Sequence, residues 1–186
     1  MSLKETIEEA NAAYVLRKGP SKHPAVKCAI LTCMDARMDP AQFAGLADNG
    51  YVIRNAGGRV TEDAVRSLVI SAKMLGTTEW YVIHHTECGM ASFTNETMRA
   101  LLKESVGPSV CENGRWRNVS DLPGAETDMD FLPIAEEPRC LIEDVKRLRA
   151  HPLVPKTIPI YGYMYDIHTG RLAEIPEASA AGRAQR

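Results

Sequence analysis

Several features are scarce in this chain of 186 residues, and each absence excludes a class of protein. No apolar run approaches the roughly 18 residues that a membrane-spanning helix needs. Neither sign of charge dominates, because 22 basic residues stand against 24 acidic ones, which argues against a nucleic-acid partner or an anionic membrane surface. The first residues are acidic and amphipathic, unlike a secretory signal peptide. We therefore predict a cytoplasmic protein that binds neither nucleic acid nor membrane.

Cysteine and glycine patterns exclude two further classes. Five cysteines is an odd number, and a chain of this length buries a sufficient core without disulfides, so reduced thiols remain free to bind metal. The pair Gly57-Gly58 fits neither the G-x-G-x-x-G nor the G-x-x-x-x-G-K-[ST] spacing, so no nucleotide-binding loop is predicted. The two glycines instead allow the backbone to approach a ligand or another element closely.

Alternating strand and helix patterns predict an α/β fold whose mainly parallel central sheet is flanked by helices. The clearest element is a helix over Thr61 to Leu75, with a capping threonine, two acidic residues in its first turn and Gly76 after its end. The other expected helices cover residues 2–17, 40–46, 94–105 and 141–149, and the expected strands cover 26–31, 51–53, 80–84 and 157–165, with a short last strand after residues 166–171.

By length, residues 1–186 are predicted to form a single domain. Residues 1–20 are set apart as an N-terminal arm, whose helix packs either on its own sheet or on a partner subunit. Residues 106–138 lack a sustained period and are predicted to be a long loop excursion. Residues 177–186 are predicted to be a flexible tail.

Two short segments that follow expected strands carry the candidate chemistry. Cys33 follows the first strand, and His85 and Cys88 follow the strand over 80–84. Since ligands gather at the carboxyl ends of parallel strands, these three side chains are expected to converge. Two thiolates and one imidazole, with the fourth position left to water, are the ligand set of a catalytic zinc ion. The expected reagent is a zinc-bound hydroxide, because zinc lowers the pKa of bound water to about 7.

A charged pair lies close to the first of these ligands. In Cys33-x-Asp35-x-Arg37, the carboxylate either binds the metal or accepts a hydrogen bond from the metal-bound water. A guanidinium that pairs with the carboxylate in bidentate fashion holds it ionised and off the metal. We therefore predict that Arg37 keeps Asp35 off zinc and that Asp35 orients the hydroxide, the alternative being a structural ion pair. Of two adjacent histidines, His85 is the predicted ligand for its H-x-x-C spacing, and His84 is a packing or supporting residue on the opposite face.

Three motifs, in their order and spacing, resemble the β-class carbonic anhydrases, and in particular their compact microbial branch. The resemblance runs from about residue 22 to residue 172, and the motifs are Cys33-Met34-Asp35-Ala36-Arg37, Arg54-Asn55-Ala56-Gly57-Gly58 and His84-His85-Thr86-Glu87-Cys88-Gly89-Met90.

The resemblance implies a zinc enzyme that reversibly hydrates carbon dioxide to bicarbonate and a proton. It places Zn²⁺ on Cys33, His85 and Cys88, and it gives Asp35 and Arg37 the paired roles described above. The implied fold is a mainly parallel sheet with an N-terminal helical arm that reaches across a homodimer or a higher homo-oligomer, with the site at the dimer interface.

The same branch also resembles hydrolases of carbonyl sulfide and carbon disulfide, linear molecules that a zinc hydroxide attacks at carbon. Motifs at the metal do not separate these substrates, and the excursion over 106–138 is expected to narrow or cover the pocket entrance. An alternative from another class is a zinc-binding regulatory protein without turnover, in which Asp35 occupies the fourth zinc position permanently. The presence of Arg37 argues against that alternative.

Further site residues are predicted from their neighbourhood. His23 is the candidate proton relay, because a histidine that titrates near neutral pH suits that role. His151 and His168 have no comparable placement and are expected to be structural or solvated. The candidate lining of the substrate pocket is Ala56, Gly57, Gly58 and Gly89.

Overall fold

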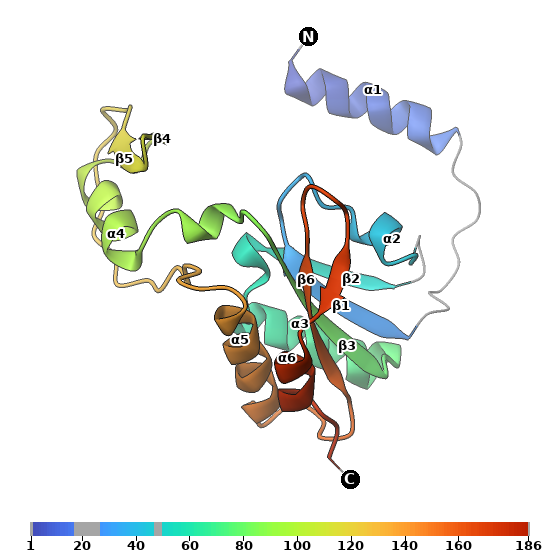
Figure 1. The fold of residues 1–186 in the computed structure, drawn as a ribbon. Helices are drawn as coiled ribbons and strands as arrows, with labels where there is room; N and C mark the ends of the chain where they lie inside the picture. The colour runs from blue at the N-terminus through green and yellow to red at the C-terminus, as the bar shows by residue number, and fades with distance from the viewer. Residues whose placement is uncertain (1, 17–26, 47–49, 186) are drawn as a thin grey trace.

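Five strands form the central sheet of the computed structural model, which describes residues 2–16, 27–46 and 50–185 (Figure 1). The strand order is β2-β1-β3-β6-β7, in which the first four strands are parallel and β7 runs antiparallel to β6. The predicted α/β fold with a mainly parallel sheet is therefore confirmed. The strand bounds are β1 Cys28–Cys33, β2 Tyr51–Asn55, β3 Glu79–His85, β6 Ile160–Tyr165 and β7 Leu172–Glu174.

The five predicted helices are present, with small differences at their ends, and a sixth helix was not predicted. α3 begins after Thr61, whose hydroxyl accepts a hydrogen bond from the amide of Ala64, and it ends at Gly76 in the left-handed conformation. Among the described residues, no helix is long and apolar enough to cross a bilayer. The helix bounds are α1 Leu3–Val15, α2 Pro40–Phe43, α3 Glu62–Leu75, α4 Asn95–Glu104, α5 Arg139–Ala150 and α6 Pro176–Ala181, with 3-10 turns η1 Ala56–Gly58 and η2 Gly89–Ala91.

Two apolar clusters cover the two faces of the sheet. Alternate residues of β1 and β3, such as Leu31 and Val82, pack against α3, α5 and α6. The residues between them, such as Ile30 and Ile83, face the side on which Phe43 of α2 lies. This second face leaves a cavity of about 470 Å³ next to α2. The α3 side of the sheet is thus covered by three helices, and the α2 side is partly open.

The N-terminal helix α1 lies apart from the sheet (Figure 1). Ser2 and Glu5 form a capping box, in which each side chain accepts a hydrogen bond from the other residue's amide. Every residue from 2 to 16 is exposed, including Leu3 and Ile7, the apolar positions of the helix. The sequence left two placements open for this arm, packing on its own sheet or packing on a partner subunit. The helix does not pack on its own sheet.

The excursion contains a β-hairpin that the sequence analysis did not predict. β4 (Ser109–Glu112) pairs antiparallel with β5 (Arg115–Asn118). The two-residue loop is Asn113-Gly114, both with positive φ (51° and 75°), as in the turn type that matches the twist of a hairpin. With α4, this hairpin projects from the rest of the chain (Figure 1). The expectation of an irregular loop over 106–138 was therefore wrong for its first part.

The expected flexible tail over 177–186 is also corrected. Residues 176–181 form α6, and Ala178 is fully buried against β6. A Cβ at Gly162 would lie 2.4 Å from the Cβ of Ala178, so only a glycine in β6 allows this approach. The carbonyl of Gly182 accepts hydrogen bonds from the amide of Ile160 and from Arg149. The small side chains of this segment permit close packing, which their composition alone did not reveal.

Candidate metal centre

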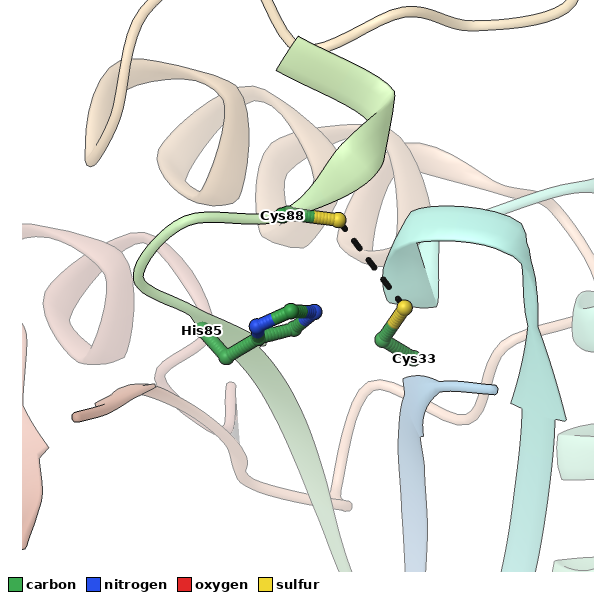
Figure 2. A group of neighbouring side chains, drawn as sticks. All are labelled: Cys33, His85 and Cys88. Carbon is green, nitrogen blue, oxygen red and sulfur yellow. Dashed lines mark hydrogen bonds between the residues drawn. The ribbon is translucent and has the colours of Figure 1, made fainter. Parts of the chain in front are cut away.

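The three predicted ligands meet at the carboxyl end of the sheet. Cys33 is the last residue of β1 and His85 is the last residue of β3, and these two strands are adjacent and parallel. Cys88 lies in the turn that follows β3, and Figure 2 shows its side chain and that of Cys33 directed toward one another beside the His85 ring. The ligand atoms of all three lie within 4.8 Å of one another, and all three residues are buried.

The geometry of this group suits a tetrahedral metal ion. Two thiolates bound to one ion at about 2.3 Å with a tetrahedral angle lie roughly 3.8 Å apart. The observed distance between the sulfur atoms of Cys33 and Cys88 is 3.9 Å. Nδ1 of His85 lies 2.9 Å from the carbonyl of Thr86, which fixes the hydrogen on Nδ1 and leaves Nε2 as a lone-pair donor. Nε2 is buried without a hydrogen-bond partner, as expected of an atom that binds a metal.

The electrostatic environment favours a thiolate in this group. The hydrogen bond from Cys88 lowers the pKa of the Cys33 thiol, and it raises the pKa of Cys88 in turn. Backbone amides of Asp35 and Gly57 also lower the pKa of Cys33. Burial opposes the charged form of His85, but the nearby sulfur of Cys33 outweighs burial and raises the pKa of His85. A cation is the natural partner for such a cluster, because a metal ion replaces the proton that the thiols share.

Asp35 is held beside the ligand group and outside it. Arg37 forms a bidentate pair with Asp35, with Nε 3.0 Å from Oδ1 and Nη2 2.7 Å from Oδ2. The amide of Arg37 donates a further hydrogen bond to Oδ1. The hydrogen bond from Arg37 is the main reason why the pKa of Asp35 lies well below its usual value. Oδ2 of Asp35 nevertheless lies 3.9 Å from Nε2 of His85, so an ionised carboxylate borders the fourth metal position.

The glycine pair after β2 lies directly against the backbone of Cys33. Gly57 and Gly58 are buried in η1, with φ of 79° and 66°. A Cβ at Gly58 would lie 2.9 Å from the backbone nitrogen of Cys33, so this position requires glycine. Ala56 and Gly89, the other two residues predicted to line a substrate pocket, are exposed. The contact at Gly58 is with the backbone of β1. Of the two roles that the sequence allowed for the glycine pair, this is close approach to another element of the fold.

Residues 28–172 match the model of the carbonic anhydrase family. The chain belongs to that family. It is 35% identical over 160 residues to β-carbonic anhydrase 1 of Mycobacterium tuberculosis, which covers 85% of this chain and 88% of the relative. A crystal structure of a carbonic anhydrase from Streptococcus mutans matches with a TM-score of 0.79 at 40% identity and covers 94% of this chain and 98% of that chain. The resemblance inferred from the motifs, and with it the expectation of an enzyme, is confirmed.

A second group of relatives has a different name. Carbon disulfide hydrolase of Acidianus sp. is 33% identical over 151 residues, which cover 77% of this chain and 74% of the relative. The apo form of a carbon disulfide hydrolase matches with a TM-score of 0.58 at 30% identity and covers 92% of this chain and 90% of that chain. Both kinds of enzyme are therefore relatives of this chain, as the motifs implied.

Of the remaining residues that the sequence singled out, one lies outside the described residues and another supports the ligand segment. His23, the expected proton relay, lies outside the described residues. Arg54, which was noted only as part of a motif, donates hydrogen bonds to the carbonyls of Cys33 (3.0 Å) and Asp35 (2.5 Å). It thereby fixes the segment that carries both a ligand and the carboxylate. Its place in that motif, three positions before Gly57, is the signal that marked it.

A buried charged network lies behind His85. His84, which points away from the ligand group, lies 2.8 Å from Glu137 and 3.3 Å from Asp144. Arg59 pairs with Asp144 at 2.6 Å and donates to the carbonyl of Leu132. Burial alone would raise the pKa of Asp144, but the hydrogen bonds from His84 and Arg59 outweigh burial and lower it. The network ties β3 to the end of the excursion, and no local sequence signal predicts it because Arg59 and Asp144 are 85 residues apart.

Proposed function

We propose that this protein is a zinc enzyme that reversibly hydrates carbon dioxide to bicarbonate and a proton. The observation that carries the proposal is the group of Cys33, His85 and Cys88, with donor atoms at tetrahedral spacing beside an ionised carboxylate. Two thiolates and one imidazole suit zinc, which in such a site lowers the pKa of a bound water to about 7 and supplies the nucleophile. Membership of the carbonic anhydrase family supports the same metal and the same reaction.

The side chains around the metal position have separate tasks in this proposal. Asp35 remains ionised because Arg37 donates two hydrogen bonds to it, so it accepts a hydrogen bond from the reacting water and orients that water toward the carbon of the substrate. Arg37 prevents Asp35 from occupying the fourth metal position. The pair therefore favours an active enzyme over a zinc-binding regulatory protein with a closed metal site.

Carbonyl sulfide and carbon disulfide are the second candidate substrates. The observation that favours them is the 33% identity to a carbon disulfide hydrolase. The same nucleophile attacks the carbon of each of these linear molecules. Carbon dioxide is the preferred proposal because the carbonic anhydrase of Streptococcus mutans matches with a TM-score of 0.79 at 40% identity, against 0.58 at 30% identity for the solved carbon disulfide hydrolase.

Stopped-flow measurement of carbon dioxide hydration by the zinc-loaded protein tests the proposal. We expect Asp35→Asn to lower kcat/KM by about 100-fold or more, and Cys88→Ser to lose both zinc and activity. Asp63→Asn is a matched control, because Asp63 also pairs with an arginine, Arg66, and this pair lies on the solvent-exposed face of α3. An inactive wild type with stoichiometric zinc would refute carbon dioxide hydration. Parallel assays of sulfide release from carbonyl sulfide and carbon disulfide would then decide whether the second candidate holds.

We also propose a homodimer or higher homo-oligomer in a reducing, cytoplasmic compartment. The exposed apolar residues of α1 and the partly open α2 face of the sheet support association of subunits. None of the five cysteines forms a disulfide, which supports a reducing compartment. Light scattering on the full chain and on a chain that lacks residues 1–20 tests the association. If the full and the shortened chain form assemblies with the same number of subunits, the arm has no role in association. Cell fractionation tests the compartment.

A further inference from the structure

An ion pair that the sequence did not predict lies at the edge of the metal centre. His168, in the turn between β6 and β7, has its Nε2 2.9 Å from Oε1 of Glu87. Glu87 stands between two of the proposed ligands, His85 and Cys88, with a positive φ of 54°. The side chains of His168 and Glu87 are 69% and 61% exposed, so the pair is open to solvent. An imidazole is thus attached to the turn that carries the ligands.

The turn of His168 is fastened to the ligand turn by a second contact. The hydroxyl of Thr86 accepts a hydrogen bond from the amide of Ile167 at 3.1 Å. Arg37 links the ligand turn to Asp35. Its Nη2 donates one hydrogen bond to Oδ2 of Asp35 at 2.7 Å and another to the carbonyl of Glu87 at 3.2 Å. A continuous series of polar contacts therefore runs from the carboxylate at the buried centre to the exposed imidazole.

The other described histidines do not have this combination of properties. His84 is fully buried and paired with carboxylates, and His85 is a proposed ligand. His151 follows α5, and the nearest carboxylate to it is that of Glu62, 3.9 Å away. Among the described residues, His168 is the histidine that is both exposed and joined to the ligand turn.

We propose that His168 is the proton-transfer group of this enzyme, which takes up the proton released in each hydration and passes it to a buffer base in solvent. The proposal rests on the proposed hydration of carbon dioxide, in which carbon dioxide and water give bicarbonate and one proton. Because a carboxylate only accepts hydrogen bonds, Nε2 of neutral His168 carries the hydrogen that faces Glu87, and Nδ1 is free to accept the proton through hydrogen-bonded water. The imidazolium then releases the Nδ1 proton to the buffer base, which restores the neutral ring.

The charges around the ring suit this role. The hydrogen bond to Glu87 is the main cause that raises the pKa of His168 above its usual 6.5, Asp166 raises it further, and Arg37 opposes both. A proton-transfer group works best when its pKa lies near the working pH, and histidine is the side chain whose ordinary pKa lies nearest to neutral pH. The pair with Glu87 therefore both positions the ring and adjusts its proton affinity.

The kinetic test compares zinc-loaded wild type, His168→Gln and the control His151→Gln in weak, imidazole-free buffer. We expect His168→Gln to lower kcat by about 100-fold, the low end of what positioned proton transfer contributes. Its kcat/KM should stay within a factor of two, because kcat/KM covers the conversion of carbon dioxide and excludes the later release of the proton. Added imidazole should restore kcat, and His151→Gln should match wild type throughout.

A second measurement does not depend on turnover. NMR titration of the His168 ring in the metal-free protein should give a pKa above the usual 6.5, and Glu87→Gln should lower it. A ring pKa that does not respond to Glu87→Gln would overturn the proposal, as would an unchanged kcat in weak buffer. A joint fall of kcat and kcat/KM without rescue by imidazole would show a structural role and overturn it too. These outcomes, obtained with an active wild type, refute the role of His168 alone, whereas an inactive wild type refutes the proposed function and this role with it.

Discussion

Replacement of Gly58 by alanine tests whether the glycine pair shapes the metal centre. Gly58 has a φ of 66°, a conformation that costs an L-residue about 1 to 2 kcal/mol. The added Cβ would also lie 2.9 Å from the backbone nitrogen of Cys33 and 2.9 Å from the carbonyl carbon of Thr32. Backbone atoms of a buried strand cannot rotate away as a side chain can, so β1 must shift, at a cost of about 1 to 3 kcal/mol. We expect Gly58→Ala to lower the free energy of unfolding by about 2 to 5 kcal/mol in total.

The same shift should weaken metal binding. Because the clash is with the nitrogen of Cys33, the displacement reaches the ligand whose sulfur lies 3.9 Å from that of Cys88. Changes that disturb the support of a metal ligand commonly reduce affinity by about 10- to 100-fold. Urea titration of the metal-free protein measures the loss of stability, and competition with a chromogenic zinc chelator measures the affinity.

Gly114→Ala is the matched control. Gly114 also has a positive φ, of 75°, but a Cβ there would meet no atom within 4 Å. It isolates the conformational cost of about 1 to 2 kcal/mol and should leave zinc affinity unchanged. If Gly58→Ala proves no more destabilising than Gly114→Ala and binds zinc equally well, the close approach of Gly58 to Cys33 does not support the metal centre, and our reasoning is refuted.

Three further predictions follow from the buried contacts. Asp144→Asn leaves Arg59 buried without its charged partner and should lower the free energy of unfolding by about 3 to 5 kcal/mol at neutral pH. Because the folded-state pKa of Asp144 is lowered from 3.8, its contribution is present above that pH and is lost as the pH falls through the lowered pKa. The deficit of the variant in urea titrations should therefore begin to shrink near pH 3.8 and shrink further at lower pH. Gly162→Ala would place a Cβ 2.4 Å from that of Ala178 and should cost about 1 to 3 kcal/mol, part of which Ala178→Gly in the same chain should restore; an additive double variant would contradict the contact. Zinc at 100 times its dissociation constant should stabilise the wild type by about 2.7 kcal/mol in calorimetry and should not stabilise Cys88→Ser, and equal stabilisation of both would exclude Cys88 as a ligand.

The parts of the fold that the sequence predicted have local causes. α3 was placed closely because Thr61, its acidic first turn and Gly76 each act within a few residues of the helix ends. Cys33 and His85 were expected to meet because each ends a strand, and the ends of adjacent parallel strands lie together. In both cases the decisive contacts lie within one element or between two neighbouring strands.

The parts that the sequence missed depend on contacts between distant segments. Arg59 reaches Asp144 across 85 positions, and His168 reaches Glu87 across 81 positions. Neither residue stands in a recognisable motif with its partner, so their charges appear as ordinary surface charges in the sequence. The tail was misjudged for a related reason, because Ala178 packs against Gly162, and two small residues in distant segments give no periodic signal. The hairpin was different, since Asn113-Gly114 was a readable turn signal that the lack of apolar alternation around it obscured.

The geometry of the ligand group depends on residues that bind no metal. The end of β1 and the segment after it are held by the backbone contact of Gly58 and by Arg54, which donates hydrogen bonds to the carbonyls of Cys33 and Asp35. The segment after β3 is held through Thr86 by the turn at Ile167. Because the fold fixes both segments, the two sulfur atoms already lie at a tetrahedral separation before metal binds. Little conformational entropy is therefore lost when the metal orders them. A chain with the same two cysteines and histidine, but without the glycine after β2 and the arginine before it, would therefore be expected to bind zinc more weakly, although its ligand motif would look the same.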